Sequence, residues 1–118
     1  METQQIKFVA QGIRDVFRRF TPVIMSWGAI HFKETVYNNM PGLRFSVKGF
    51  LFQGTVVVVL NMGADLYEVY CLDAAENVVK SRDGVYCDEL VDVIDELVEK
   101  DSTDQEYSDK VNEWLMTG

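Results

Sequence analysis

The chain has few of the residues from which catalytic and metal sites are usually built. Its 118 residues include one histidine, His31, and two cysteines, Cys71 and Cys87. One histidine and two separated cysteines fall short of the four ligands of a structural zinc site, and any Ser/His or Cys/His arrangement would have to use His31. No phosphate-binding glycine loop, Gly-x-Ser-x-Gly, His-Glu-x-x-His or EF-hand spacing occurs. The sequence therefore predicts no cofactor and no metal, and it favours a protein without catalytic activity.

Long apolar runs and an excess of positive charge are also missing. The longest unbroken apolar run is Val56–Leu60, whereas a membrane-spanning helix needs about 20 residues. Nineteen acids against eleven Lys and Arg give a net charge of -8, opposite in sign to the footprint of a protein that coats nucleic acid. The first residues lack a secretory-signal pattern, and small secreted domains usually carry more cysteines. We therefore expect a cytoplasmic protein with no membrane partner and no direct contact with nucleic acid.

What the chain does contain is enough apolar material for one core. Hydrophobic residues make up 47% of it and aromatic residues 12%. No linker and no internal repeat interrupts the sequence, so residues 1–118 are expected to form a single domain. The charge is divided unevenly: residues 1–54 hold seven bases and three acids, a net of +4, and residues 55–118 hold four bases and sixteen acids, a net of -12. This asymmetry favours a polarised surface.

Five stretches alternate with a period of two or form β-branched runs, which predicts strands. They are Ser26–Val36, Leu43–Lys48, Thr55–Leu60, Leu66–Leu72 and Val78–Arg82. The segment between the first two ends in Pro41-Gly42, which suits a type II turn. Because the connections are short, we expect consecutive strands to pair as an antiparallel meander.

Helical periodicity frames these strands on both sides. Apolar residues recur with a period of 3.6 over Thr3–Phe20, which Pro22 is expected to end. An acidic helix is expected to start at Cys87 or Asp88 and reach about Lys100, followed by a last helix capped by Ser102 or Thr103. The predicted fold class is α+β: a meander of about five strands with an N-terminal helix and a C-terminal helical pair packed on one face.

Two charged helix flanks are candidate interaction surfaces. The acidic ridge of the first C-terminal helix consists of Asp92, Asp95, Glu96 and Glu99. It could bind a basic protein or imitate DNA phosphates, although solvating a helix face is the commoner role. The basic stripe of the N-terminal helix consists of Lys7, Arg14 and Arg18. It could contact phosphates, or meet the acidic ridge within one chain or across a dimer.

Several predicted strands are apolar on both sides, which helices on one face cannot cover. Large exposed apolar patches in soluble proteins usually mark contact sites, so the second sheet face or an edge beside it is expected to meet another chain. A pocket between sheet and helices is the other possibility. Its candidate side chains are the polar-tipped aromatics Trp27, Tyr67 and Tyr70, together with His31.

The stretch Met40–Phe45 with Gly49, followed by Leu66–Tyr70 and an acidic helix, resembles uncharacterised small bacterial α+β proteins. The resemblance covers residues 25–100. Such families are often found on mobile or accessory elements, so the resemblance implies an accessory protein. It contains no catalytic motif and brings no functional residues.

Three functions are consistent with these features. The first is a small cytoplasmic interaction module without catalytic activity, most simply a homodimer or a protein that binds another protein. The second is a ligand-binding or enzymatic domain with its pocket between sheet and helices. The third is an acidic decoy that occupies a basic nucleic-acid-binding protein.

Overall fold

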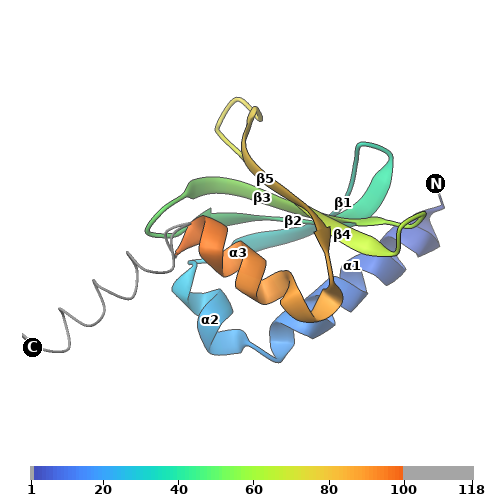
Figure 1. The fold of residues 1–118 in the computed structure, drawn as a ribbon, viewed down its shortest axis with the longest axis horizontal. Coiled ribbons are helices and arrows are strands. Elements are labelled where there is room, and N and C mark those ends of the chain that lie inside the picture. Colours follow the sequence, from blue (N-terminus) through green and yellow to red (C-terminus); the bar gives the residue numbers. More distant parts are fainter. Residues whose placement is uncertain (1, 100–118) are drawn as a thin grey trace, which may run out of the picture.

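The computed structural model describes residues 2–99 as two layers, with a five-stranded antiparallel sheet above and the helices below it (Figure 1). The helices are α1 (Thr3–Arg18), α2 (Thr21–Ser26) and α3 (Leu90–Val98), the last preceded by a 3₁₀ turn at Cys87–Glu89. The strands are β1 (Ile30–Tyr37), β2 (Met40–Lys48), β3 (Gln53–Asn61), β4 (Leu66–Leu72) and β5 (Val78–Val85). They lie in the order β1-β2-β3-β4-β5, so the predicted α+β meander is confirmed. The second member of the predicted C-terminal helical pair lies outside the described residues.

The N-terminal part differs from the prediction between Phe20 and Ile30. The helix predicted over Thr3–Phe20 ends at Arg18, and Thr21–Ser26 forms α2 instead of leading into a strand. Proline is well tolerated in the first turn of a helix, where its missing N–H has no partner in any case. Pro22, which the sequence was expected to use only as a helix stop, therefore lies in the first turn of α2. Gly28, with φ 63°, then turns the chain into β1.

The first hairpin turn also differs from the predicted Pro-Gly turn. Met40, Pro41 and Gly42 belong to β2, and the turn is Asn38-Asn39, with φ of 52° and 61°. Two central residues with positive φ are the pattern of the tight type I′ hairpin, whose twist matches that of the strands. At the other end of the meander, the strand predicted over Val78–Arg82 continues through Asp83 and Gly84 to Val85.

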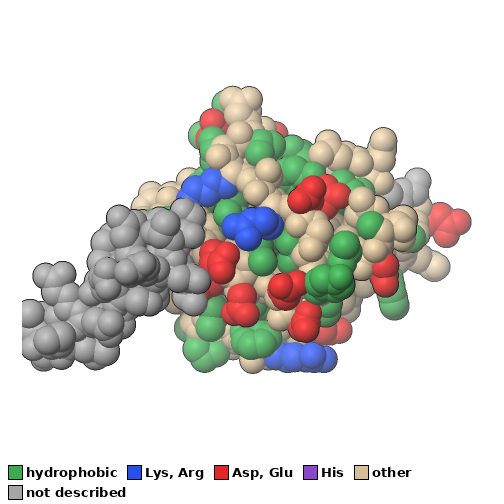
Figure 2. Space-filling model, in the orientation of Figure 1, with side chains coloured by type: hydrophobic (Ala, Val, Ile, Leu, Met, Phe, Trp, Pro, Cys, Tyr) green, Lys and Arg blue, Asp and Glu red, His purple; other side chains and the backbone are tan. Residues whose placement is uncertain are grey.

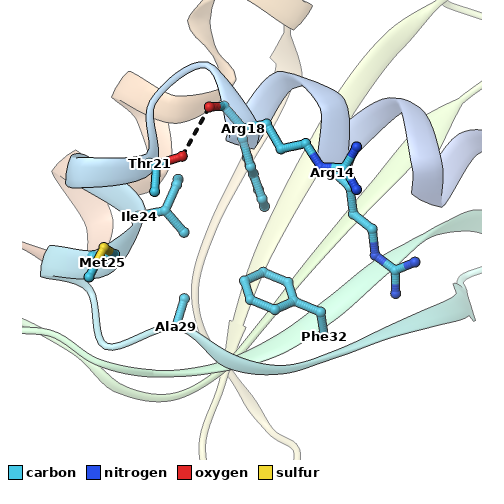
Figure 3. A pocket seen from close by; sticks show the side chains of 8 residues that line it. Arg14, Arg18, Thr21, Ile24, Met25, Ala29 and Phe32 are labelled. Carbon is cyan, nitrogen blue, oxygen red and sulfur yellow. Dashed lines mark hydrogen bonds between the residues drawn. The ribbon is translucent and has the colours of Figure 1, made fainter.

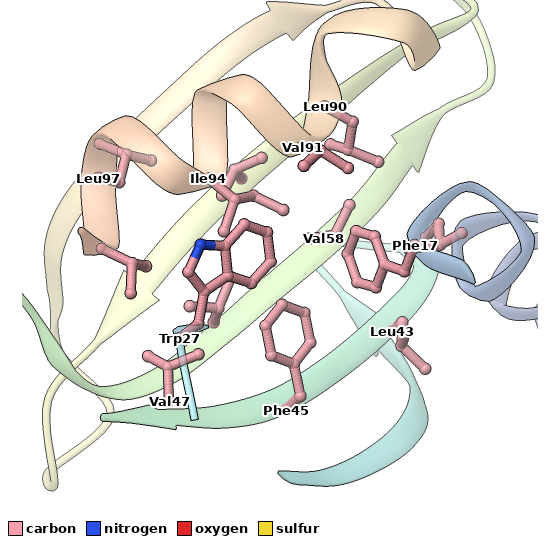
Figure 4. Close-up of a cluster of buried hydrophobic side chains, with 14 of the residues drawn as sticks. Phe17, Trp27, Leu43, Phe45, Val47, Val58, Leu90, Val91, Ile94 and Leu97 are labelled. Atoms are coloured by element: carbon pink, nitrogen blue, oxygen red, sulfur yellow. The ribbon is translucent and has the colours of Figure 1, made fainter. Parts of the chain in front are cut away.

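The main core fills the space between the sheet and the three helices (Figure 4). Its centre is a group of aromatic rings: Phe17 of α1 packs edge-on against Phe45 of β2 at 5.5 Å and against Trp27 at 6.0 Å. From α3, Leu90, Ile94 and Leu97 pack against the same layer. Since α1 packs on β1 and β2 while α3 packs on β4 and β5, the helices divide the lower face between them.

A second, smaller core lies on the upper face of the sheet. Val57, Val59 and Leu72 are buried there, and Tyr37, Met40 and Tyr70 pack against them. The doubly apolar strands noted in the sequence are therefore covered in part by side chains of the same sheet.

Candidate functional site

A groove opens at the edge of the lower layer, between α1, α2 and β1 (Figure 3). Its volume is about 410 Å³, within the range of small-molecule sites. The lining residues are Arg14, Phe17, Arg18, Thr21, Ile24, Met25, Ala29 and Phe32. We call this the α1–α2–β1 groove.

Local sequence explains how α1 and α2 form two of its walls. Arg14 and Arg18 are four residues apart, so they lie one above the other on α1, at the flank of the arc that buries Ile13 and Phe17. The break after Arg18 lets α2 start in a new direction and bring Ile24 and Met25 against the cavity. The Thr21 hydroxyl donates a hydrogen bond to the Arg18 carbonyl oxygen at 3.0 Å and so ties the two helices together.

A β-bulge in β1 supplies the third wall. Ile30 pairs with Ser46, but Lys33 pairs with Arg44, so β1 has one more residue than β2 over this interval. His31 adopts φ 60° within it. A bulge changes the sheet face on which the following side chains lie. Ile30 is paired with Ser46 and lies on the upper face, whereas Phe32, two residues later, lies on the lower face. The Phe32 ring points into the lower layer and stacks on Phe45 at 5.0 Å.

The two arginines give the groove a positive rim above apolar walls. Arg18 Nη1 lies 3.5 Å from Asp15 Oδ1, and both side chains are exposed, so this ion pair is weak. Arg14 is half-buried and has no hydrogen bond or ion pair with the residues between 2 and 99. The residues of this range that line the groove include no carboxylate. The arrangement therefore offers guanidinium donors to an anion next to an apolar floor.

The four aromatic and imidazole residues predicted to line a pocket are not brought together. Trp27 is fully buried, behind Phe17, and its Nε1 donates to Asp95 Oδ1 at 2.9 Å. His31 is exposed at the bulge. Tyr67 packs at the margin of the main core, and burial raises its pKa. Tyr70 lies on the upper face, where a hydrogen bond with Glu68 raises its pKa.

Most of the acidic ridge is engaged within the chain. Besides Asp95, Glu99 Oε1 accepts a hydrogen bond from the Phe50 backbone N–H at 3.1 Å, and Glu96 Oε2 lies 3.6 Å from Arg82 Nη1. Asp92 is exposed. Acidic side chains gather over α3 in Figure 2, with Lys and Arg side chains next to them. Of the basic stripe, Arg14 and Arg18 meet in the groove, whereas the exposed Lys7 is not among its lining residues.

The upper face carries a polar cluster of its own. Glu68 accepts hydrogen bonds from the Tyr70 hydroxyl and from Asn61 Nδ2, the latter at 3.1 Å. Arg44 on β2 pairs with Glu76 in the β4–β5 turn at 2.8 Å. These contacts connect neighbouring strands and hairpins over the smaller core.

Residues 2–99 contain no group of three or more His, Cys, Asp or Glu side chains that could hold a metal ion. Within the same range, none of the helices has the length and apolar character needed to cross a membrane. Cys71 is buried and Cys87 exposed, and neither is in a disulfide. Burial raises the pKa of the Cys71 thiol to about 11, so this side chain is an inert part of the core.

Comparison with family models, with curated proteins and with solved structures gives no match to this chain. The resemblance to small bacterial α+β proteins stays a prediction.

Proposed function

We propose that the protein is a binding module without catalytic activity and that the α1–α2–β1 groove is its contact site. The observation that carries the proposal is a cavity of about 410 Å³ with mainly apolar walls, open at a rim where the Met25 side chain is 73% exposed. Ligand sites are typically concave and apolar, with a few placed polar groups. The groove has this composition.

The walls support binding because they are held in place without a ligand. Phe17 and Phe32 both pack against Phe45, and Ile24 is buried. A preformed cavity spares the ligand part of the entropic cost of ordering its site.

The lining favours binding over chemistry. A guanidinium stays protonated in proteins and cannot serve as a general base. The Thr21 hydroxyl donates to a backbone carbonyl, and the described lining offers no imidazole, thiol or carboxylate to activate it. Acid–base and nucleophilic catalysis need such a partner.

The edges of the sheet give less support to self-association by strand pairing. Natural edge strands are protected by bulges and charged side chains. β1 has the bulge at His31 followed by Lys33, and β5 has two register shifts along with Lys80 and Arg82. A homodimer stays a prediction, and the groove is the better supported contact site.

Binding of an uncharged apolar dye, Nile red, tests the proposal. We expect saturable fluorescence enhancement that weakens at least fivefold in Met25→Glu, because a carboxylate then projects into the apolar groove. Met62→Glu is the matched control, since Met62 is also an exposed methionine but lies in the β3–β4 turn. Absence of saturable binding, or equal weakening by both variants, would contradict the proposal.

A further inference from the structure

We infer that the groove is built for an apolar monocarboxylic acid, a small molecule with one carboxylate on an aliphatic or aryl body. This inference rests on the function proposed above and goes further by specifying the head group. It is carried by the placement of Arg14 and Arg18, one helical turn apart at the rim of a mainly apolar cavity.

The head group follows from the donors available at the rim. A guanidinium presents a planar fork of N–H donors that matches the two oxygens of a carboxylate. Arg14 has no partner among residues 2–99, and the Arg18–Asp15 pair is solvent-exposed at 3.5 Å. An incoming carboxylate can therefore engage both arginines without breaking a buried interaction.

The position of the rim favours one negative charge over two. Arg18 is the last residue of α1, and the carbonyl end of a helix carries partial negative charge. Typical phosphate sites use the backbone N–H groups at the N-terminus of a longer helix, whereas the helix that begins at this groove, α2, has only six residues. A carboxylate is better matched to this environment than a phosphate dianion.

The body of the ligand follows from the walls and from the volume. Phe17, Ile24 and Phe32 present only carbon to the cavity. A volume of about 410 Å³ accommodates about fourteen groups the size of a water molecule, at about 30 Å³ each. A ten-carbon acid, decanoate, fits within that limit, and the open rim leaves the carboxylate beside the arginines.

The test measures displacement of Nile red from the full chain at pH 7 by decanoate, decanol and decyl phosphate, each kept below its micelle-forming concentration. We expect decanoate to bind at least tenfold more tightly than decanol and more tightly than decyl phosphate. Arg14→Gln should weaken decanoate about tenfold and leave decanol unchanged. Lys7→Gln is the matched control, because Lys7 belongs to the same stripe but does not line the groove, and it should change neither affinity.

The outcomes separate this inference from the function on which it rests. If Nile red binds in a Met25-dependent manner but decanol equals decanoate, or if Arg14→Gln has no effect, the carboxylate assignment is overturned and the binding module stands. If decyl phosphate binds most tightly, the assignment of a carboxylate head group is wrong. If no probe binds, both proposals fall.

Discussion

The indole Nε1 of Trp27 donates a hydrogen bond to Asp95 Oδ1 at 2.9 Å, joining residues that are 68 positions apart. Trp27 directly follows α2, and its ring is fully buried against Phe17 and Phe45. Asp95 lies on α3, the helix that covers the other half of the sheet. The bond therefore fixes α3 to the layer that forms the back of the α1–α2–β1 groove, and it gives one acid of the acidic ridge a structural role.

Removing the acceptor of this bond should destabilise the fold. Asp95→Ala leaves a buried indole N–H without Asp95 as its partner, and we expect a loss of about 1–3 kcal/mol in the free energy of unfolding. Asp92→Ala, at an exposed position of the same helix, should stay within about 0.5 kcal/mol of the parent. Urea unfolding measures both. Equal effects of the two variants would assign Asp95 to the solvated face.

Two glycines should respond oppositely to the same substitution. A Cβ at Gly42 would overlap the Val58 carbonyl oxygen on the neighbouring strand, so Gly42→Ala should cost about 1–3 kcal/mol. Gly12, within α1, has no atom within 4 Å of the corresponding position, and Gly12→Ala should stabilise by about 0.5–1 kcal/mol. Thermal unfolding measures both changes in stability, as a lower melting temperature for Gly42→Ala and a higher one for Gly12→Ala. A neutral Gly42→Ala would contradict the close approach of Gly42 to the Val58 carbonyl oxygen.

The buried thiol of Cys71 should make the protein lose stability at alkaline pH. Its pKa rises from 9.0 to about 11 on burial, so the folded state disfavours the thiolate. The resulting contribution to stability is complete below about pH 9 and is lost as the pH rises toward 11. Urea midpoints measured from pH 8 to 11 should fall less steeply in Cys71→Ala than in the parent.

The exposed Cys87 supplies the control for that series, since Cys87→Ser should leave the slope unchanged. In the folded parent, Cys87 should react with a thiol reagent well before Cys71. Rapid modification of both thiols would contradict the burial of Cys71.

The backbone at His31 should matter more than its imidazole. With φ 60°, this position disfavours β-branched residues and accepts glycine. We expect His31→Val to cost more than about 1 kcal/mol, whereas His31→Gly stays near neutral and keeps the Nile red affinity of the parent. If His31→Gly abolished binding without unfolding the chain, the imidazole would belong to the site.

The sheet could be predicted from sequence because its strands carry strong local signals. Leu66–Leu72 alternates regularly, and the structure places β4 at those residues. The acidic helix was equally readable, since Leu90, Ile94 and Leu97 keep one face apolar over nine residues. These elements depend on side-chain period alone, and that period is visible in one sequence.

The groove could not be predicted, because it depends on two backbone features without a strong local signal. α2 has only six residues, too few for a helical period to be distinguished from the alternation of the strand predicted to start at Ser26. The bulge at His31 then reverses the face of Phe32 relative to Ile30. The basic stripe with Arg14 and Arg18 can be predicted from the sequence, but the walls that α2 and β1 form opposite these arginines cannot. The hydrogen bond of the half-buried Asp95 could not be predicted for a similar reason, since a helical wheel cannot show that Trp27 reaches it.

The site of ligand binding is tested most directly by mapping the backbone amide shifts that decanoate causes in a ¹⁵N-labelled sample of the full chain. We expect saturable shifts concentrated between Arg14 and Phe32, which spans the C-terminal part of α1, all of α2 and the bulge of β1. Shifts concentrated on α3 or on the β4–β5 hairpin, or none below the micelle-forming concentration, would contradict binding in the groove.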